Sequence, residues 1–357
     1  FIMMRDSMPK LTALNLKNVR IKVPTSGNIN PDWKDDEIPL EGFRGKKTLT
    51  SIVLPDVIKS IGSNAFSDSG LKGSLNIPEG VVEIGKWAFT NNDFTGILTL
   101  PSTLKKIGGY AFTGCCFICP LNLPDGIEEI GCGCFEDCRY LYGKLILPSH
   151  LKKMGSSAFR GCTGFKGDLV IPKSLTVIPF LAFYECGLEG RLQLHDGITA
   201  IEKCAFTRNG FIGELELPKS LTILEGGNFD GNYFSGSFKI PKGLLSISVS
   251  AFTNCAFTGE AEIPEGILSI GGGAFYNCEN LQKIILPSSL ELIDDQAFGY
   301  CKSLRVIECK STVPPVVNDR AFYGVSLEDL TVIVPKSALN DYKSSAFWSG
   351  LLLKTVE

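Results

Sequence analysis

The stretch Ser74–Gly96, SLNIPEGVVEIGKWAFTNNDFTG, recurs with variations along most of the chain. The proline of its Ile-Pro step returns every 23 residues, or 24 in two repeats, and His195 replaces it once. A phenylalanine follows at the same distance each time. The prolines are Pro55, Pro78, Pro101, Pro124, Pro148, Pro172, Pro218, Pro241, Pro264 and Pro287, and the phenylalanines are Phe66, Phe89, Phe112, Phe135, Phe159, Phe183, Phe206, Phe229, Phe252, Phe275 and Phe298. A fixed period of this length indicates stacked structural repeats.

Aliphatic residues precede each proline at alternate positions, as Leu75 and Ile77 do. A period of two predicts a short strand whose intervening residue faces solvent. Val81, Ile84 and the Ala-Phe step supply further inward positions. One repeat cannot bury these side chains alone, so the repeats must stack at about 4.8 Å. We predict a right-handed, β-rich repeat solenoid of about 12–13 repeats of 23–24 residues, with little helix.

The repeats divide the chain into three parts of one continuous domain. Residues 1–50 are expected to form a capping repeat and a polar loop over residues 24–36. Residues 51–325 are the repeats, and residues 326–357 are expected to form a last strand, at Leu330–Val334, and a C-terminal cap with a short helix. The glycine that closes many repeats, such as Gly73 or Gly96, suits a turn with positive φ or a close backbone approach.

Charge and hydropathy exclude some classes of function. The 357 residues contain 35 Lys and Arg and 38 Asp and Glu, without a long run of one sign, so a nucleic-acid partner is not expected. No apolar run has the length of a membrane span. We expect a monomer that needs no cofactor.

Seven of the thirteen cysteines form one column, three residues after the repeated phenylalanine: Cys115, Cys138, Cys162, Cys186, Cys255, Cys278 and Cys301. Other repeats hold Asn92, Asn209 or Asn232 at this position. A small donor there can satisfy buried backbone carbonyls, so we interpret the column as a structural ladder.

Catalytic and metal motifs are weak in this sequence. His150 and His195 lie at turn positions of different repeats, and we expect no catalytic role for either. Cys116, Cys119 and Cys132 stand near the ladder cysteines with a spacing that superficially suits zinc. Three ligands are too few for a closed structural site, so free thiols are favoured over a local disulfide or zinc.

The strand face is the candidate binding surface because outward residues of successive repeats align there. Its columns are mixed in charge, with an acidic part between Glu214 and Glu262, and contain no exposed aromatic residue. The alternative is a solvated face whose charges oppose edge aggregation. The candidate residues are Lys144, Asp168, Arg191, Gln193, Glu214, Glu216, Lys239, Glu260 and Glu262.

The consensus x-L-x-I-P-x-x-V-x-x-I-G-x-x-A-F-x-x-C resembles the BspA-like leucine-rich repeat family of Bacteroidetes surface proteins. The opening MRDSMPKLTALNLKNVRI and the ending VPKSALNDYKSSAFWSGL are similar to the terminal segments of that branch. His195 for Pro, Pro179 for Gly and Cys134 for Ala depart from the pattern.

The resemblance implies a non-enzymatic adhesion or binding protein that contacts an extracellular or host protein or glycan. It further implies secretion or display at the cell surface, as a lipoprotein anchored in the outer membrane whose signal segment is not in this chain. The alternatives are a structural spacer without a ligand and an enzyme with an unrecognised site.

Overall fold

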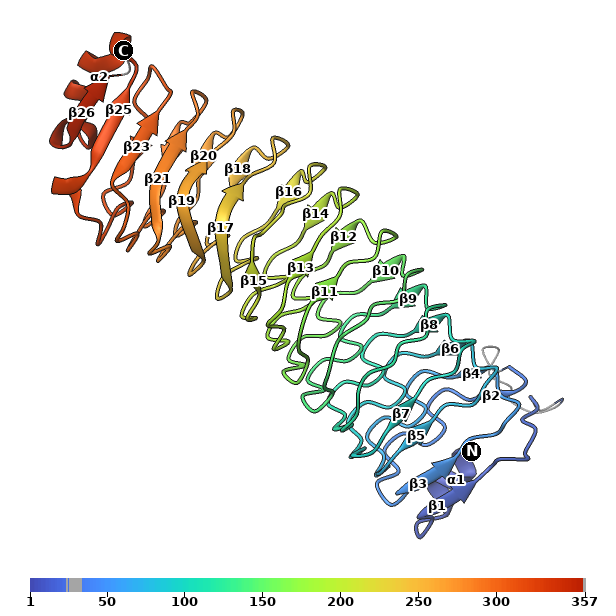
Figure 1. Ribbon diagram of the computed structural model, residues 1–357. Coiled ribbons are helices and arrows are strands. Elements are labelled where there is room, and N and C mark those ends of the chain that lie inside the picture. The colour runs from blue at the N-terminus through green and yellow to red at the C-terminus, as the bar shows by residue number, and fades with distance from the viewer. Residues whose placement is uncertain (24, 26–33, 356–357) are drawn as a thin grey trace. The chain divides into compact units, whose positions relative to one another are not determined.

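The computed structural model describes residues 1–23, 25 and 34–355, and most of the predicted loop over residues 24–36 lies outside them. The chain is a parallel β-solenoid with little helix, as the repeat predicts, and it has about 14 turns where about 12–13 repeats were expected. Two compact units make up the chain: residues 1–175 with 181–188, and residues 176–180 with 189–357. In each of them Figure 1 shows the strands in two rows.

The first unit contains a six-stranded parallel sheet with the order β10-β9-β8-β6-β4-β2. Its strands are β2 Glu37–Ile38, β4 Ser60–Ile61, β6 Glu83–Ile84, β8 Lys106–Ile107, β9 Glu129–Ile130 and β10 Lys153–Met154. The other row contains β1 Ala13–Asn15 paired with β3 Ser51–Val53, β5 Leu75–Asn76 paired with β7 Leu98–Thr99, and β11 Leu169–Val170. Two-residue strands are too short to show a period of two, so the sequence did not reveal the six-stranded sheet.

An unpredicted helix, α1 Ile2–Ser7, packs beside the first repeat. The buried Lys46 ammonium donates to the carbonyl oxygens of Arg5 at 2.9 Å and Met8 at 2.5 Å. Phe1 contacts Phe43 edge to face, with 5.5 Å between ring centroids. These contacts attach the N-terminal segment to the solenoid core.

The second unit has two rows of parallel strands, and one row has longer strands than the first unit. The shorter strands are β12 Val177–Ile178, β14 Ala200–Ile201, β16 Ile223–Leu224, β18 Ser246–Ile247, β20 Ser269–Ile270, β22 Leu292–Ile293 and β24 Val316–Val317. The other row contains β13 Leu192–Gln193, β15 Ile212–Gly213, β17 Tyr233–Lys239, β19 Ala256–Glu262, β21 Leu281–Leu286, β23 Val306–Cys309, β25 Thr331–Val334 and β26 Leu352–Thr355. The strands of this second row are therefore longer from β17 onward. The change begins in repeats that still carry the closing glycine.

The C-terminal segment continues the solenoid further than the sequence indicated. Its helices are η1 Leu327–Asp329, η2 Lys336–Ala338, α2 Leu339–Ser344 and η3 Trp348–Gly350. β26 pairs with β25, so the strand at Leu330–Val334 is followed by another one. Trp348 is buried and donates from Nε1 to the carbonyl oxygen of Pro315 at 2.9 Å. This hydrogen bond and the burial of the indole ring hold the C-terminal segment against the preceding repeat.

The repeated phenylalanines form a stacked column in the core of each unit. In the first unit the rings of Phe43, Phe66 and Phe89 lie nearly parallel, with centroids 5.5 and 5.2 Å apart. In the second unit Phe252, Phe275 and Phe298 are spaced by 5.4 Å. Each stacked pair contributes roughly 0.5–1.5 kcal/mol beyond the burial of its apolar area. The fixed position of phenylalanine in the sequence thus becomes a continuous core.

Candidate binding face

The nine residues predicted for the strand face lie in both units. Lys144 and Asp168 belong to the first unit and the other seven to the second. The alternation of strand positions orients them outward: Leu215 is buried, whereas Glu214 and Glu216 on either side of it are exposed. The structure brings five of the nine together in one groove: Arg191, Gln193, Glu214, Glu216 and Lys239.

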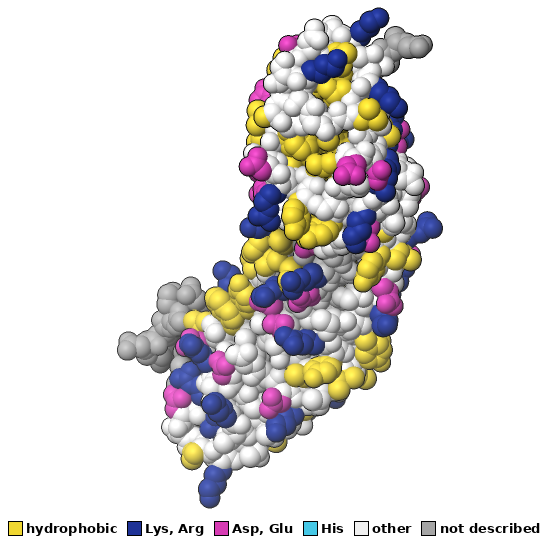
Figure 2. Space-filling model, turned by 90° about the vertical axis from the view of Figure 1, so that its left-hand side faces the viewer, with side chains coloured by type: hydrophobic (Ala, Val, Ile, Leu, Met, Phe, Trp, Pro, Cys, Tyr) yellow, Lys and Arg dark blue, Asp and Glu magenta, His cyan; other side chains and the backbone are white. Residues whose placement is uncertain are grey.

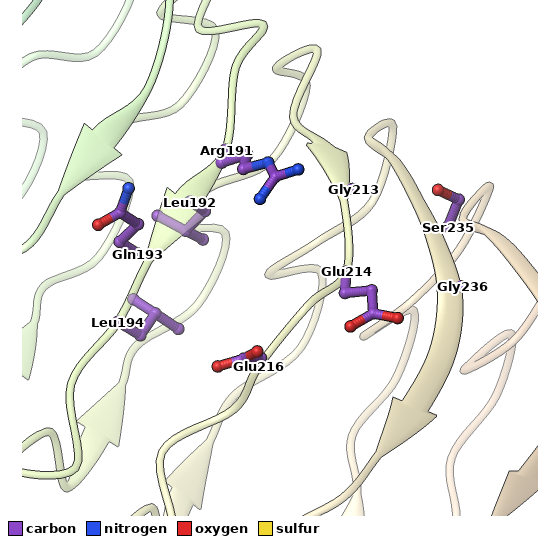
Figure 3. Close-up of a pocket in the computed structure, with 9 residues that line it drawn as sticks. All are labelled: Arg191, Leu192, Gln193, Leu194, Gly213, Glu214, Glu216, Ser235 and Gly236. Atoms are coloured by element: carbon purple, nitrogen blue, oxygen red, sulfur yellow. The ribbon is translucent and has the colours of Figure 1, made fainter.

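The groove consists of two adjoining hollows of about 690 and 730 Å³, which share Glu214 and Glu216. Figure 3 shows the first hollow, where Gln193 projects from β13, Arg191 from the residue before that strand, and the two glutamates from the next repeat. Gly213, Ser235 and Gly236 complete its lining. Because these three residues are small, the surface between neighbouring repeats is hollowed here.

Long side chains of one repeat cover glycines of the next one. Arg191 passes over Gly213, where a Cβ atom would lie 3.7 Å from Arg191 Nε. Glu214 lies closer to Gly236, where a Cβ atom would lie 2.9 Å from Glu214 Cγ. The glycine at position 236 therefore allows Glu214 to adopt its orientation along the groove.

The predicted acidic part is not electrostatically uniform. Glu260 pairs with Lys283 at 3.1 Å and Glu262 with Lys310 at 2.8 Å. The Lys310 ammonium lowers the pKa of the Glu262 carboxyl. Within the described residues, neither Glu214 nor Glu216 forms an ion pair. Among the described residues, the glutamates of this face thus form ion pairs one repeat beyond Lys239 but not in the groove.

The second hollow adds basic residues and an apolar floor. Lys219, Lys239 and Lys242 line it together with Pro218 and Pro241. Lys219 lies 4.0 Å from Asp196, and both side chains are largely exposed. Glu216 and Lys239 are neighbours in strand register. The groove therefore offers an acidic row beside a basic one, which suits a ligand with charges of both signs.

Exposed apolar and aromatic residues lie in and around the predicted columns, and sequence analysis did not name them as candidates. In the first unit Ile146 is 66% exposed and Tyr142 47% exposed. In the second unit Tyr233 is 65% exposed. Figure 2 shows one face of the molecule on which hydrophobic, basic and acidic side chains are interspersed. Tyr142 precedes the glycine that closes its repeat, a position the alternation rule does not cover.

All seven ladder cysteines are buried and donate from Sγ to the phenylalanine carbonyl of the preceding repeat. Two examples are Cys138 to Phe112 at 3.0 Å and Cys278 to Phe252 at 3.2 Å. Asn232 makes the equivalent contact with Phe206 at 3.0 Å. Burial raises the pKa of the Cys115 thiol to about 12. The column thus supplies a second donor to these carbonyl oxygens, which also accept from a backbone amide three residues further on, as Phe112 does from Cys115 at 3.1 Å.

The remaining candidate ligands and nucleophiles are dispersed. His150 Nδ1 lies 3.3 Å from a carboxylate oxygen of the exposed Asp125, and the Gly197 amide donates to His195 Nδ1 at 3.0 Å. Cys119 is buried, Cys132 is exposed, and all thirteen cysteines are free. The part of the chain that the structure describes contains no cluster of three or more metal-ligating side chains.

None of the helices among the described residues has the length and apolar character needed to cross a membrane.

Comparison with known proteins identifies the repeat. The model of the BspA type leucine rich repeat region matches in six copies, over residues 36–166, 139–235, 165–279 and 228–354. A leucine-rich repeat protein from Bacteroides ovatus shares 23% identity over 97% of this chain and 92% of its own, with a TM-score of 0.60. A leucine rich cell surface protein from Faecalibacterium prausnitzii shares 22% identity over 97% and 87%, with a TM-score of 0.43.

No curated protein sequence matches the chain. The family model covers nearly all the repeats, and the Bacteroides ovatus structure has the same fold. The chain therefore belongs to the BspA-type leucine-rich repeat family.

Proposed function

We propose that this chain is a non-enzymatic binding module, secreted or displayed at the cell surface, that contacts an extracellular protein or glycan through its strand face. The observation that carries the proposal is the groove around Glu214 and Glu216. These carboxylates have no ion-pair partner among the described residues, whereas Glu260 and Glu262 in the same columns are paired. Carboxylates that form no ion pair within the described chain are available to the positively charged groups of a partner.

The arrangement of the two glutamates supports binding over hydrolysis. Glu214 and Glu216 are successive outward residues of one segment and project from the same wall of the groove (Figure 3). A glycosidase needs two carboxyl groups that flank the scissile bond from opposite sides. Repeat surfaces also provide contact area for macromolecules more readily than deep pockets for small substrates.

Surface-immobilised binding tests the proposal with fibronectin, fibrinogen and mucin glycans as probes. The double variant Glu214→Gln, Glu216→Gln should weaken binding at least tenfold. The matched control is Glu260→Gln, Glu262→Gln, which makes the same change in the same columns where lysines already compensate the charge. The control should bind within about twofold of the unmodified chain.

Two outcomes oppose the proposal. Equal loss in both double variants would indicate a general electrostatic effect and not a groove. Absence of binding to every probe at micromolar concentration would favour a structural spacer.

A further inference from the structure

Three tyrosines lie side by side at the turns of three successive repeats of the second unit. We call Tyr276, Tyr300 and Tyr323 the tyrosine strip. The ring centroids are 5.3 Å apart for the first pair and 5.4 Å for the second, and each pair meets edge to face. The Arg320 guanidinium lies 5.7 Å from the Tyr323 ring centroid. Tyr323 is 51% exposed, so this aromatic cluster reaches the surface.

The fold does not require tyrosine at these positions. The residue after the repeated phenylalanine is threonine in several repeats, where its hydroxyl donates to a carbonyl of the next repeat. Thr113 donates to Gly133 at 2.6 Å, and Thr253 donates to Gly273 at 2.8 Å. Tyr276 and Tyr323 occupy this position, and within the described residues neither makes that bond. Tyrosine in place of threonine therefore lacks this hydrogen bond between repeats and places an aromatic ring at the turn.

The strip is held in place by its neighbours. The Tyr276 ring covers Gly299 and the Tyr300 ring covers Gly324, where in each case a Cβ atom would lie 2.9 Å from the ring. The neighbouring Tyr323 phenol raises the pKa of Tyr300. Rings fixed in this way lose little conformational entropy when a ligand binds.

A ladder of side-chain amides adjoins the strip. Asn277 donates to Asn254 at 2.9 Å, and Asn254 donates to Asp230 at 3.0 Å. The Asn277 backbone amide donates to Gly299, which places Asn277 beside the Tyr300 repeat. Amide groups and tyrosine hydroxyls next to aromatic rings can bind hydroxyl groups and apolar C–H surfaces together.

From this geometry we propose that the tyrosine strip is a binding site for a short, linear oligosaccharide of neutral pyranoses. The C–H face of a pyranose packs on the electron-rich face of an aromatic ring, and its hydroxyls pair with amides and phenols. Because neighbouring rings of the strip are nearly perpendicular, a pyranose can pack on the face of one ring while its hydroxyls lie beside the edge and phenol of the next. This site is independent of the groove around Glu214 and Glu216.

Calorimetric titration of the purified chain with cellohexaose and with chitohexaose tests the site. We expect at least one hexasaccharide to bind and Tyr323→Ala to weaken it at least tenfold. Tyr323→Trp, which keeps an aromatic face, should retain binding. The matched control is Tyr184→Ala in the first unit, because Tyr184 holds the same repeat position and has Arg160 6.0 Å from its ring centroid. This control should bind like the unmodified chain.

Three results would overturn the site. The first is the absence of binding to both hexasaccharides, and the second is an equal loss of affinity in Tyr184→Ala. The third is a Tyr323→Ala variant that still binds the hexasaccharide and loses only the binding of a protein. Should Tyr323→Ala fail to fold, Arg320→Ala replaces it with the same expected loss. The variant Glu214→Gln, Glu216→Gln should leave saccharide binding unchanged, so failure of the strip and failure of the groove are distinguishable.

Discussion

Glu214 lies over Gly236 of the next repeat, so closely that a Cβ atom at Gly236 would come within 2.9 Å of Glu214 Cγ. Tyr300 covers Gly324 in the same manner. In both cases the missing side chain of one repeat gives space to a long side chain of the preceding one. The surface of this solenoid is thus shaped by pairs of residues about 22–24 positions apart.

Gly236→Ala should displace Glu214 and weaken partner binding at the groove. Gly236 has a φ of +85°, so alanine also introduces backbone strain of about 1–2 kcal/mol. Gly259→Ala is the matched control, because Gly259 has a φ of +74° and nothing within 4 Å of its Cβ direction. Both variants should lose similar stability in urea unfolding, but only Gly236→Ala should lose affinity. Equal affinities would show that the orientation of Glu214 does not matter.

Phe206→Ala should lower the free energy of unfolding by about 3–5 kcal/mol, because it opens a cavity in the core column. Phe206 is fully buried and lies 5.9 Å from the Phe229 ring, centroid to centroid. Glu216→Ala, at an exposed position, should change the unfolding free energy by less than about 0.5 kcal/mol. Thermal and urea unfolding measure both, and similar values for the two variants would contradict the inward assignment of the phenylalanine column.

Asn232→Asp should destabilise the chain by at least about 3 kcal/mol, because a buried carboxylate cannot donate a hydrogen bond. Asn232 donates to the carbonyl oxygens of Phe206 at 3.0 Å and Phe229 at 3.1 Å. Asn232→Cys should be tolerated better, since Cys255 holds the same position and donates to Phe229 at 3.5 Å. Urea unfolding ranks the two variants, and an equal loss would show that the donor is unimportant.

Stability should fall as the pH rises above about 9, because the ladder thiols stay protonated in the folded chain. Burial raises the pKa of both Cys115 and Cys301 from 9.0 to about 12. Between these values the unfolded chain loses protons that the folded chain retains, so the folded state becomes less favourable. Each thiol contributes a slope of about −1.4 kcal/mol per pH unit.

Urea unfolding at pH 8, 9 and 10 measures this dependence. Cys115→Ala should reduce the loss of stability between pH 8 and pH 10 by about 1.4 kcal/mol in total, because one thiol reaches its full slope only above about pH 10. The control Cys132→Ala, at an exposed position, should leave the loss unchanged. Identical slopes for Cys115→Ala and the unmodified chain would mean that this thiol ionises equally in both states.

The repeat made the core predictable from sequence, and the site much less so. The phenylalanine and cysteine columns could be assigned because each repeat presents the same burial pattern again. The six-stranded sheet of the first unit escaped notice because its strands have two residues each. Helix α1 escaped notice because a six-residue helix leaves little periodic signal. The tyrosine strip escaped notice because Tyr300 lies one position further from its phenylalanine than Tyr276 and Tyr323 do.

The sequence by itself determined the solenoid and its inward residues, since local periodicity and burial dictate both. Tertiary structure alone decided which surface charges are compensated: Glu262 pairs with Lys310, 48 residues away, while Glu214 and Glu216 remain unpaired within the described residues. It also decided which glycines lie beneath Glu214 and Tyr300. The physical reason is that a core position is repeated in every turn, whereas an ion pair or a covered glycine depends on two particular side chains that stacking brings into contact.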